Sequence, residues 1–323
     1  MRVGVIGCGA VFDAFYLHAL RRQQKDGLIE LVLLVDNQAD NIEAAQQYFS
    51  RAKAENDLEA GLTQAGLDRA IVLTPPASHA PIMRALAEAG VHVYCEKPLA
   101  VSPDEARAIS ELFSSKELIC RVGYVRRLFP NFQAFRSLYS NLGPDRRISI
   151  SDGEVFRWPI KTGAIFTPTE AGGGVVWDKL SHNLDIIQWI AGLRSIEHVR
   201  TNCRPGRVPV DVLVEGTTDH GNFRVAVSWT EGLANLVSAN DGIETIETKN
   251  GLAHSLRVSS GRLDSLPATP GIGSYGDAVA AALEEFLRLG NWRDESVLAT
   301  AAQSIVLTDC LSLIDKAARA GGL

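Results

Sequence analysis

A polar stripe on one expected helix carries the side chains best suited to acid–base chemistry. Glycines at 172–174 precede a helix that is expected to continue to residue 191. At about 100° per residue, four side chains share one narrow stripe: Asp178, His182, Asp185 and Trp189. Leu180, Leu184, Ile187 and Ala191 fall on the opposite side. A histidine flanked by carboxylates can be held in one tautomer and can act as an acid or base near neutral pH.

Two other interpretations of this stripe stay open. The spacing of Asp178 and His182 also resembles a pair of metal ligands, but no third ligand stands out, so no metal site is expected. The stripe could instead be a half-exposed polar helix face that contains only intrahelical pairs.

A glycine-containing turn near the N-terminus has the form of a phosphate-binding loop. Residues 7–12, Gly-Cys-Gly-Ala-Val-Phe, follow an apolar strand and precede a helix. Gly7 and Gly9 allow a tight turn and a close approach of the backbone to a pyrophosphate at the helix N-terminus. Phe12 stands where this pattern has its third small residue, and it is expected to change how the helix packs on the strand. A plain strand–helix turn is the alternative.

An acidic residue ends the second apolar run of the chain. Asp36 directly follows residues 29–35, Ile-Glu-Leu-Val-Leu-Leu-Val. A carboxylate there can accept hydrogen bonds from an adenosine ribose diol, and it repels a 2′-phosphate. This arrangement predicts NAD as the cofactor, with NADP less favoured. Asp36 could alternatively be only a helix N-cap or turn residue.

Two further loops follow apolar strands and are expected at the same edge of a parallel sheet. Residues 74–79, Thr-Pro-Pro-Ala-Ser-His, come after one strand, and residues 96–99, Glu-Lys-Pro-Leu, come after the next. Ligands of open α/β sheets bind beyond the carboxyl ends of the strands. Lys97 could therefore point into a crevice near a substrate hydroxyl. The alternatives are a rigid loop whose Ser78 caps the next helix, and a lysine that is merely solvated.

The elements that would position these loops follow an alternating pattern over the first 124 residues. Apolar strand signals at 2–6, 29–35, 69–74, 91–96 and 118–124 alternate with helical stretches such as 11–25 and 39–51. Such alternation is typical of a parallel, doubly wound sheet. Beyond residue 124 the pattern changes. Between about 198 and 260 strand follows strand, which predicts a mostly antiparallel sheet open on one face, and helices at about 275–289 and 295–320 finish the chain.

Composition excludes several classes of function. The chain has 323 residues and a net charge of −6, which argues against wholesale binding to nucleic acid or to an anionic membrane. Apolar runs all stop well short of about 20 residues, so no membrane span is expected. The first residues lead directly into a strand, so no signal peptide is expected and a cytoplasmic location is predicted. The five cysteines form no CxxC pair and are expected to stay reduced.

Five motifs together resemble those of the Gfo/Idh/MocA oxidoreductases, the glucose–fructose oxidoreductase and inositol dehydrogenase family. They are GCGAVF, TPPASH, CEKPLA, GYVRRLFP and GGGVVWDKLSHNLD, in the order and at the spacings of that family, and the resemblance runs from Val3 to about Gly192. It implies an α/β fold with an N-terminal Rossmann dinucleotide-binding domain, residues 1–123. It also implies a C-terminal α+β domain, residues 124–323, whose large sheet binds substrate and forms a homo-oligomer, a dimer or tetramer.

The resemblance also implies roles for individual residues. Lys97 corresponds to the catalytic-site lysine of the family, and Asp178 and His182 correspond to its Asp and His pair. Together with the analysis above, the expected cofactor-binding residues are Gly7, Gly9, Ala10, Val11, Phe12, Asp36, Thr74, Pro75, His79, Glu96 and Lys97. Phe12 departs from the small residue that the family has at its position. Further candidates for substrate contacts are Tyr124, Arg126, Arg157, Trp158 and Asp185.

These assignments predict a dehydrogenase that moves a hydride between NAD and a carbinol or ketone carbon of a sugar, inositol or related polyol. His182, oriented by Asp178, would accept the hydroxyl proton, and Lys97 would hold the substrate oxygen, although the two roles could be exchanged. One rival is an NAD-dependent glycosidase that oxidises its sugar only transiently. The other is a non-catalytic protein that senses the dinucleotide, and the presence of all three residues favours an enzyme over it.

Overall fold

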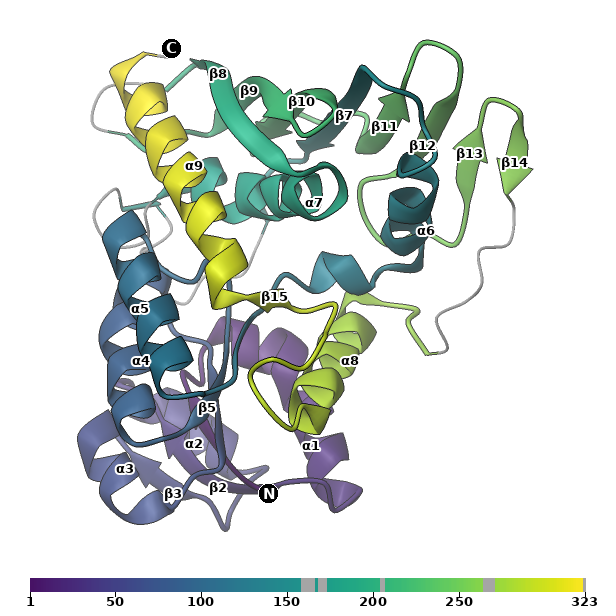
Figure 1. Ribbon diagram of the computed structural model, residues 1–323. Helices are drawn as coiled ribbons and strands as arrows, with labels where there is room; N and C mark the ends of the chain where they lie inside the picture. Colours follow the sequence, from purple (N-terminus) through teal and green to yellow (C-terminus); the bar gives the residue numbers. More distant parts are fainter. Residues whose placement is uncertain (158–165, 168–172, 204–206, 264–270, 322–323) are drawn as a thin grey trace. The chain divides into compact units, whose positions relative to one another are not determined.

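Two compact units make up the chain in this computed structural model, which describes residues 1–157, 166–167, 173–203, 207–263 and 271–321 (Figure 1). The first unit contains residues 1–123 together with residues 275–305. The second contains the described residues between 124 and 274, together with residues 306–321.

A parallel sheet with one added edge strand forms the centre of the first unit. Its strands lie in the order β15-β6-β5-β4-β1-β2-β3. They are β1 (Arg2–Ile6), β2 (Glu30–Val35), β3 (Lys53–Glu55), β4 (Arg69–Val72), β5 (His92–Cys95), β6 (Cys120–Val122) and β15 (Ala299–Thr300). Only β15 runs antiparallel to its neighbour. This sheet confirms the predicted doubly wound arrangement. The strand order reverses at β1, which is where such sheets bind ligands.

Six helices belong to the first unit. They are α1 (Leu17–Lys25), α2 (Ala39–Gln46), α3 (Leu58–Ala65), α4 (His79–Glu88), α5 (Pro103–Ser115) and α8 (Tyr275–Arg288). Local sequence sets their ends: the Asp57 carboxylate accepts a hydrogen bond from the N–H of Ala60 at the start of α3, and Pro103 occupies the first turn of α5. The helix expected from residue 11 differs in its first part, because residues 12–16 form a π-helical turn, η1, before α1 begins.

Two buried arginines bind the late segment 275–305 to the first sheet. Arg69 donates to the carbonyl oxygen of Phe286, 2.6 Å away at the end of α8, and Arg121 donates to that of Asp294 at 2.9 Å. Burial lowers the pKa of both guanidinium groups. Within this segment, residues 299–300 pair with β6, and for this reason the last helix, α9 (Ala301–Ala320), begins later than its predicted start near residue 295.

An eight-stranded, mostly antiparallel sheet forms the second unit, again as predicted. Its order is β14-β13-β12-β11-β7-β10-β9-β8. Within it, β7 and β10 pair in parallel. The strands are β7 (Arg146–Gly153), β8 (Leu193–Thr201), β9 (Asp211–Thr218), β10 (Gly221–Ser228), β11 (Leu236–Asn240), β12 (Thr245–Lys249), β13 (Leu256–Val258) and β14 (Gly261–Leu263). Burial alternates along β9, as expected for a sheet with one covered face.

Helices cover one face of this sheet. Helix α6 (Pro130–Tyr139) packs on β12, and α7 (Ser181–Ala191) packs on β8, β9 and β10 (Figure 1). Two short turns precede them, the 3₁₀ turn η3 (Val125–Leu128) and the π-helical turn η5 (Val176–Leu180). Within the described ranges, no helix is both long and apolar enough to span a bilayer.

Candidate functional site

The glycine loop after β1 has the shape that a dinucleotide loop requires. Gly7 has a φ of +98°, and a Cβ atom on it would lie 2.8 Å from the backbone of Leu73 and Thr74. Only glycine fits this close approach to the end of β4. A Cβ atom on Gly9 would meet no atom within 4 Å, so the loop surface there is open. These features fit a pyrophosphate resting against the backbone of residues 7–11.

Phe12 points away from the surface of that loop. Its side chain is fully buried, and its ring meets that of Phe49 edge-on with the centroids 6.4 Å apart. The bulky ring occurs together with the π-helical turn η1, which begins at this residue. Any contact that Phe12 makes with a dinucleotide would therefore come from its backbone.

Asp36 stands just beyond β2 and is tied to the glycine loop. Its carboxylate accepts hydrogen bonds from the N–H of Cys8 at 2.7 Å and from the N–H of Gln38 at 2.8 Å. The side-chain amide of Asn41 donates a third hydrogen bond at 3.2 Å. The turn role that the sequence left open is thus present in the structure. Contact with a ribose stays a prediction.

His79 joins the loop after β4 to the loop after β5. Its imidazole is fully buried, with Nδ1 2.9 Å from the carbonyl oxygen of Pro98 and Nε2 2.8 Å from that of Thr74. Burial lowers the pKa of His79, although the neighbouring carbonyls oppose this effect. The Oγ1 of Thr74 is buried and has no hydrogen-bond partner among the described residues, whereas Pro75 is exposed. A bound ligand could satisfy that hydroxyl, which supports a cofactor site at this loop.

Glu96 and Lys97 follow β5 at the same edge of the sheet, and both are partly exposed. The Lys97 N–H donates to Glu96 Oε2 at 3.0 Å, and the Tyr16 hydroxyl donates to Glu96 Oε1. Burial raises the pKa of Glu96, although the Tyr16 hydrogen bond and the charge of Lys97 oppose it. The loops after β1, β2, β4 and β5 therefore bring the predicted cofactor-binding residues together at one edge.

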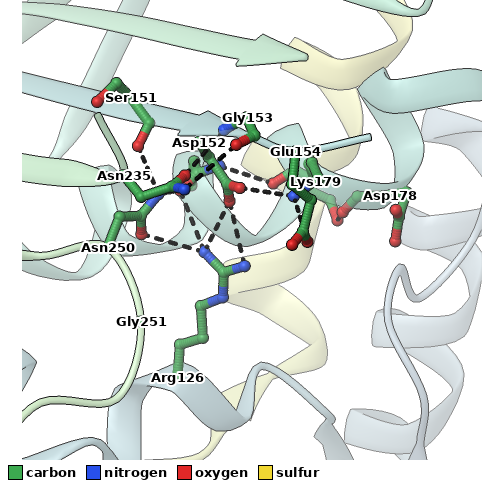
Figure 2. Close-up of polar contacts among 12 residues, drawn as sticks. Arg126, Ser151, Asp152, Gly153, Glu154, Asp178, Lys179, Asn235, Asn250 and Gly251 are labelled. Carbon is green, nitrogen blue, oxygen red and sulfur yellow. Dashed lines mark hydrogen bonds and ion pairs between the residues drawn. The ribbon is translucent and has the colours of Figure 1, made fainter. Parts of the chain in front are cut away.

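The second unit contains a polar cluster of which the sequence analysis named only Arg126. Figure 2 shows the side chains of Arg126 and Lys179 pointing toward Asp152 from separate elements. The Asp152 carboxylate, whose side chain is 5% exposed, accepts from Arg126 at 3.1 Å and from Lys179 at 2.7 Å. Burial alone would raise the pKa of Asp152, but the two cations outweigh it and lower the pKa below its ordinary value.

Asparagines complete this cluster. Asn183 donates to Asp152 at 3.1 Å, and Asn250 donates to the Oδ1 of Asn183 at 2.9 Å. Arg126 also donates to both asparagines, at 3.3 and 3.2 Å. Glu154 differs from the other members because its side chain is 74% exposed, although it accepts from Lys179 at 3.1 Å. The cluster is therefore a densely hydrogen-bonded set of polar side chains with one exposed acidic residue, Glu154, at its edge.

Asp178 and His182 lie on consecutive parts of the same helix but in different local geometry. Asp178 belongs to the π-helical turn η5 and accepts a 3.2 Å hydrogen bond from the indole of Trp229. His182 belongs to α7, is nearly buried, and meets the Tyr124 ring edge-on at 6.2 Å. The stripe that ordinary α-helical spacing predicts is thus interrupted by the wider π turn.

The remaining members of the stripe face other partners. Asp185 is buried and accepts hydrogen bonds from Arg127, the shortest at 2.6 Å. Burial raises the pKa of Asp185, and the Arg127 charge opposes it. Trp189 packs against the guanidinium of Arg136 at 4.7 Å. Because its carboxylate is already occupied inside the unit, Asp185 is poorly placed to contact a substrate.

Aromatic rings surround Trp229, whose indole donates a hydrogen bond to Asp178. The Trp229 ring lies 4.7 Å from that of Phe156 and 5.9 Å from that of Phe166, measured between centroids. Phe166 is exposed and Trp229 is buried. Arg157 is exposed, and Trp158 lies outside the described residues. Trp229, which directly follows β10, is therefore an aromatic partner of the Asp178 carboxylate that the sequence had not indicated.

Comparison with known proteins finds a family that the first part of the chain resembles. Residues 1–124 match the family model GFO_IDH_MocA, described as "Oxidoreductase family, NAD-binding Rossmann fold". Over these residues the chain is similar to this oxidoreductase family. The match confirms the NAD-binding Rossmann domain that the motifs within residues 1–124 predict.

The two relatives named here are less than a third identical to this chain over the aligned residues. It is 28% identical over 205 residues to myo-inositol dehydrogenase Hyg17 from Streptomyces leeuwenhoekii, an alignment that covers 62% of this chain and 58% of that protein. It is 25% identical to UDP-N-acetylglucosamine 3-dehydrogenase from Acidithiobacillus ferrooxidans, with 89% and 88% covered. An oxidoreductase from Thermotoga maritima has the same fold, with a TM-score of 0.84, 15% identity, and 100% and 98% of the two chains covered.

Proposed function

We propose that this chain is an NAD-dependent dehydrogenase that oxidises a CH–OH group of a sugar, inositol or related polyol, or reduces the corresponding ketone. The observation that carries the proposal is the meeting of the glycine loop, Asp36 and Lys97 at one edge of the first sheet. The two relatives named above support the substrate class, because their names describe dehydrogenases of an inositol and of a nucleotide sugar. NAD supplies the hydride-accepting chemistry when it is bound.

The first unit would bind and orient the cofactor. The backbone at Gly7 and Gly9 leaves room for a pyrophosphate, and the Asp36 carboxylate would accept hydrogen bonds from the ribose diol. A 2′-phosphate at the same place would meet the negative charge of Asp36, so NAD should be preferred over NADP. The buried hydroxyl of Thr74 would gain the hydrogen-bond partner that it lacks among the described residues.

Three residues are proposed to move the substrate proton. The Lys97 ammonium would donate a hydrogen bond to the substrate oxygen and stabilise developing negative charge. The His182 imidazole would accept the hydroxyl proton, and Asp178, held by Trp229, would orient it. The roles of Lys97 and His182 could be exchanged. Of the proposed substrate contacts, Arg126 is held in place by hydrogen bonds to Asp152, Asn183 and Asn250.

A substrate panel tests this function. Purified protein is mixed with NAD, and separately with NADP, and with each of a set of inositols, aldoses and nucleotide sugars, and NADH or NADPH absorbance is followed. We expect NADH from at least one substrate and little from the Lys97→Ala variant. Cleavage of a glycoside with tightly bound NAD and no net NADH would instead establish the glycosidase. Binding of NAD without turnover of any compound would favour the sensing protein.

Self-association and location are part of the same proposal. The second sheet has one helix-covered face, and its other face could pair with a second copy to give a dimer or tetramer. Light scattering of the purified protein would measure the mass of the assembly. All five cysteines lie within the described residues, and none of them forms a disulfide there. This fits the proposed cytoplasmic location, where thiols stay reduced.

A further inference from the structure

One carboxyl group joins the helical turn after the glycine loop to the backbone of Lys97. Tyr16 is the last residue of the π-helical turn η1, and its hydroxyl donates to Glu96 Oε1. The other oxygen, Glu96 Oε2, accepts the N–H of Lys97 at 3.0 Å. One oxygen of the Glu96 carboxyl group thus accepts from η1, and the other accepts from the backbone of Lys97.

This contact is enclosed by buried aromatic residues. The side chains of Tyr16 and Tyr94 are fully buried, and their hydroxyl oxygens lie 3.4 Å apart. The Phe286 ring packs against Tyr94 with a centroid distance of 5.8 Å. Because the surrounding rings are closely packed, the Tyr16 hydroxyl has little freedom to leave Glu96.

Gly123 provides the space for this arrangement. A Cβ atom at Gly123 would lie 3.1 Å from the Tyr94 hydroxyl and 3.3 Å from Glu96 Oε1, which is tighter than ordinary contacts. Its own N–H donates to the carbonyl oxygen of Cys95 at 2.8 Å, so the glycine cannot easily move away. The absence of a side chain at Gly123, directly after β6, therefore leaves room for the Tyr94 and Glu96 side chains.

The same π-helical turn is bonded to the glycine loop. The N–H of Asp13 donates to the carbonyl oxygen of Gly9 at 3.1 Å, and Tyr16 ends the turn that contains Asp13. A continuous path then runs from Gly9 through η1 to Tyr16, to Glu96 and to Lys97. A change in the position of the glycine loop would act on the lysine backbone through this path.

We propose that Tyr16 and Glu96 are positioning residues that hold the backbone of Lys97 and couple it to the glycine loop. The effect on turnover rests on the proposed function, whereas the coupling itself is a property of the first unit. The hydroxyl of Tyr16 is the specific link, because phenylalanine could keep the packing of the ring but not the hydrogen bond.

Hydrogen exchange of the Lys97 amide tests this proposal directly in the full-length chain. The variant Tyr16→Phe removes the hydroxyl that contacts Glu96. The matched control Tyr94→Phe removes the neighbouring buried hydroxyl, which has Tyr16 as its partner. We expect exchange at Lys97 to be roughly fivefold faster in Tyr16→Phe, since one hydrogen bond stabilises by about 1 kcal/mol. Exchange in Tyr94→Phe should stay within about twofold of the natural protein. Equal exchange in the two variants would overturn the proposal.

A second arm tests the coupling by adding NAD. In the natural protein and in Tyr94→Phe, NAD should slow exchange at Lys97, and in Tyr16→Phe this protection should be largely lost at saturating NAD. Undiminished protection in Tyr16→Phe would contradict the coupling. If Tyr16→Phe does not fold, Glu96→Ala and Glu96→Gln replace it. Exchange should be faster in Glu96→Ala and near normal in Glu96→Gln, whose amide can still serve both segments. Faster Lys97 exchange in Glu96→Gln than in Glu96→Ala would refute the role of Glu96.

The outcomes separate this inference from the proposed function. If Lys97 exchange responds as expected but no substrate is oxidised, the positioning role stands and the dehydrogenase assignment fails. If substrates are oxidised and Tyr16→Phe has normal kcat and normal Lys97 exchange, the dehydrogenase assignment stands and the positioning role fails. With a true substrate, we expect Tyr16→Phe to lower kcat more than it raises the KM for NAD.

Discussion

The carboxylate of Asp36 accepts a 2.7 Å hydrogen bond from the backbone N–H of Cys8, so the end of β2 is fixed to the glycine loop. The carboxylate that is expected to recognise a ribose therefore also shapes the loop that is expected to hold the pyrophosphate. Cofactor selectivity and loop geometry are therefore both expected to depend on the Asp36 side chain. A substitution at this position should change both properties together.

We expect Asp36→Ala to raise the kcat/KM ratio of NADP to NAD, because the charge that opposes a 2′-phosphate is removed. The kcat/KM with NAD itself should fall by roughly tenfold or more, since the Cys8 N–H loses its acceptor. Asp40→Ala, at an exposed position on α2, is the control and should leave the ratio unchanged. Steady-state kinetics with both cofactors measures this, and an unchanged ratio in Asp36→Ala would count against the proposed ribose contact.

Lys97→Ala should fold and bind NAD but lose most turnover. Loss of a positioned proton-transfer group typically lowers the rate by about 10²–10⁴-fold. Lys116→Ala, at an exposed site after α5, serves as the control for loss of a positive charge. Fluorescence titration with NAD and kcat with an identified substrate would be compared. A Lys97→Ala variant with near-normal kcat would reduce this lysine to a structural role.

The effects of Asp178→Ala and His182→Ala on kcat should not add, because the two residues are proposed to act as one unit. The double variant should be little worse than His182→Ala alone. Oxidation should also slow at low pH, as His182 becomes protonated and can no longer accept a proton. A double-mutant cycle on kcat, with thermal melts to confirm folding, measures this. Fully additive losses with an unchanged pH profile would show only a polar helix face.

The variant Trp229→Phe tests whether Asp178 orients His182. The variant removes the indole N–H that donates to Asp178 but keeps an aromatic ring against Phe156. If Asp178 orients His182, kcat should fall several-fold, and the loss should vanish in an Asp178→Ala background. An equal loss in both backgrounds would assign Trp229 to packing alone.

Asp152→Asn should destabilise the second unit by about 3–5 kcal/mol, because it leaves two nearly buried cations without their shared counter-charge. The pKa of Asp152 is lowered in the folded protein, so its stabilising contribution is present above about pH 4 and is lost as pH falls further. Urea unfolding at neutral and acidic pH would measure both effects. The control Glu154→Gln, at an exposed partner of Lys179, should change stability by less than about 1 kcal/mol.

The parallel sheet could be predicted from sequence because its buried strands are continuous apolar runs between helices, and residues 29–35 are a clear instance. The polar stripe that contains Asp178 and His182 could be predicted only in part. The rule of 100° per residue assumes α-helical geometry, and the π turn that contains Asp178 breaks that assumption. Phe12, the departure from the glycine pattern, was the local sign that the first helix also begins with a π turn.

The Asp152 cluster had no local signal in the sequence. Arg126, Asp152, Lys179 and Asn250 come from different elements and meet only through the pairing of β7 with its neighbours and the packing of α7. The roles of Arg69 and Arg121 were equally hard to predict, since a charged residue usually faces solvent. Here both are buried, and they donate to carbonyl oxygens within residues 286–294.

That late segment has a consequence for how the protein is made. On a ribosome that synthesises the chain from its N-terminus, the first unit is incomplete until residue 305 has emerged, because β15 and the carbonyl acceptors of Arg69 and Arg121 arrive last. By then every strand of the second sheet has already been released. We therefore expect a fragment that ends at residue 123 to fold poorly and aggregate through the unpaired edge of β6, even though it contains the whole glycine loop.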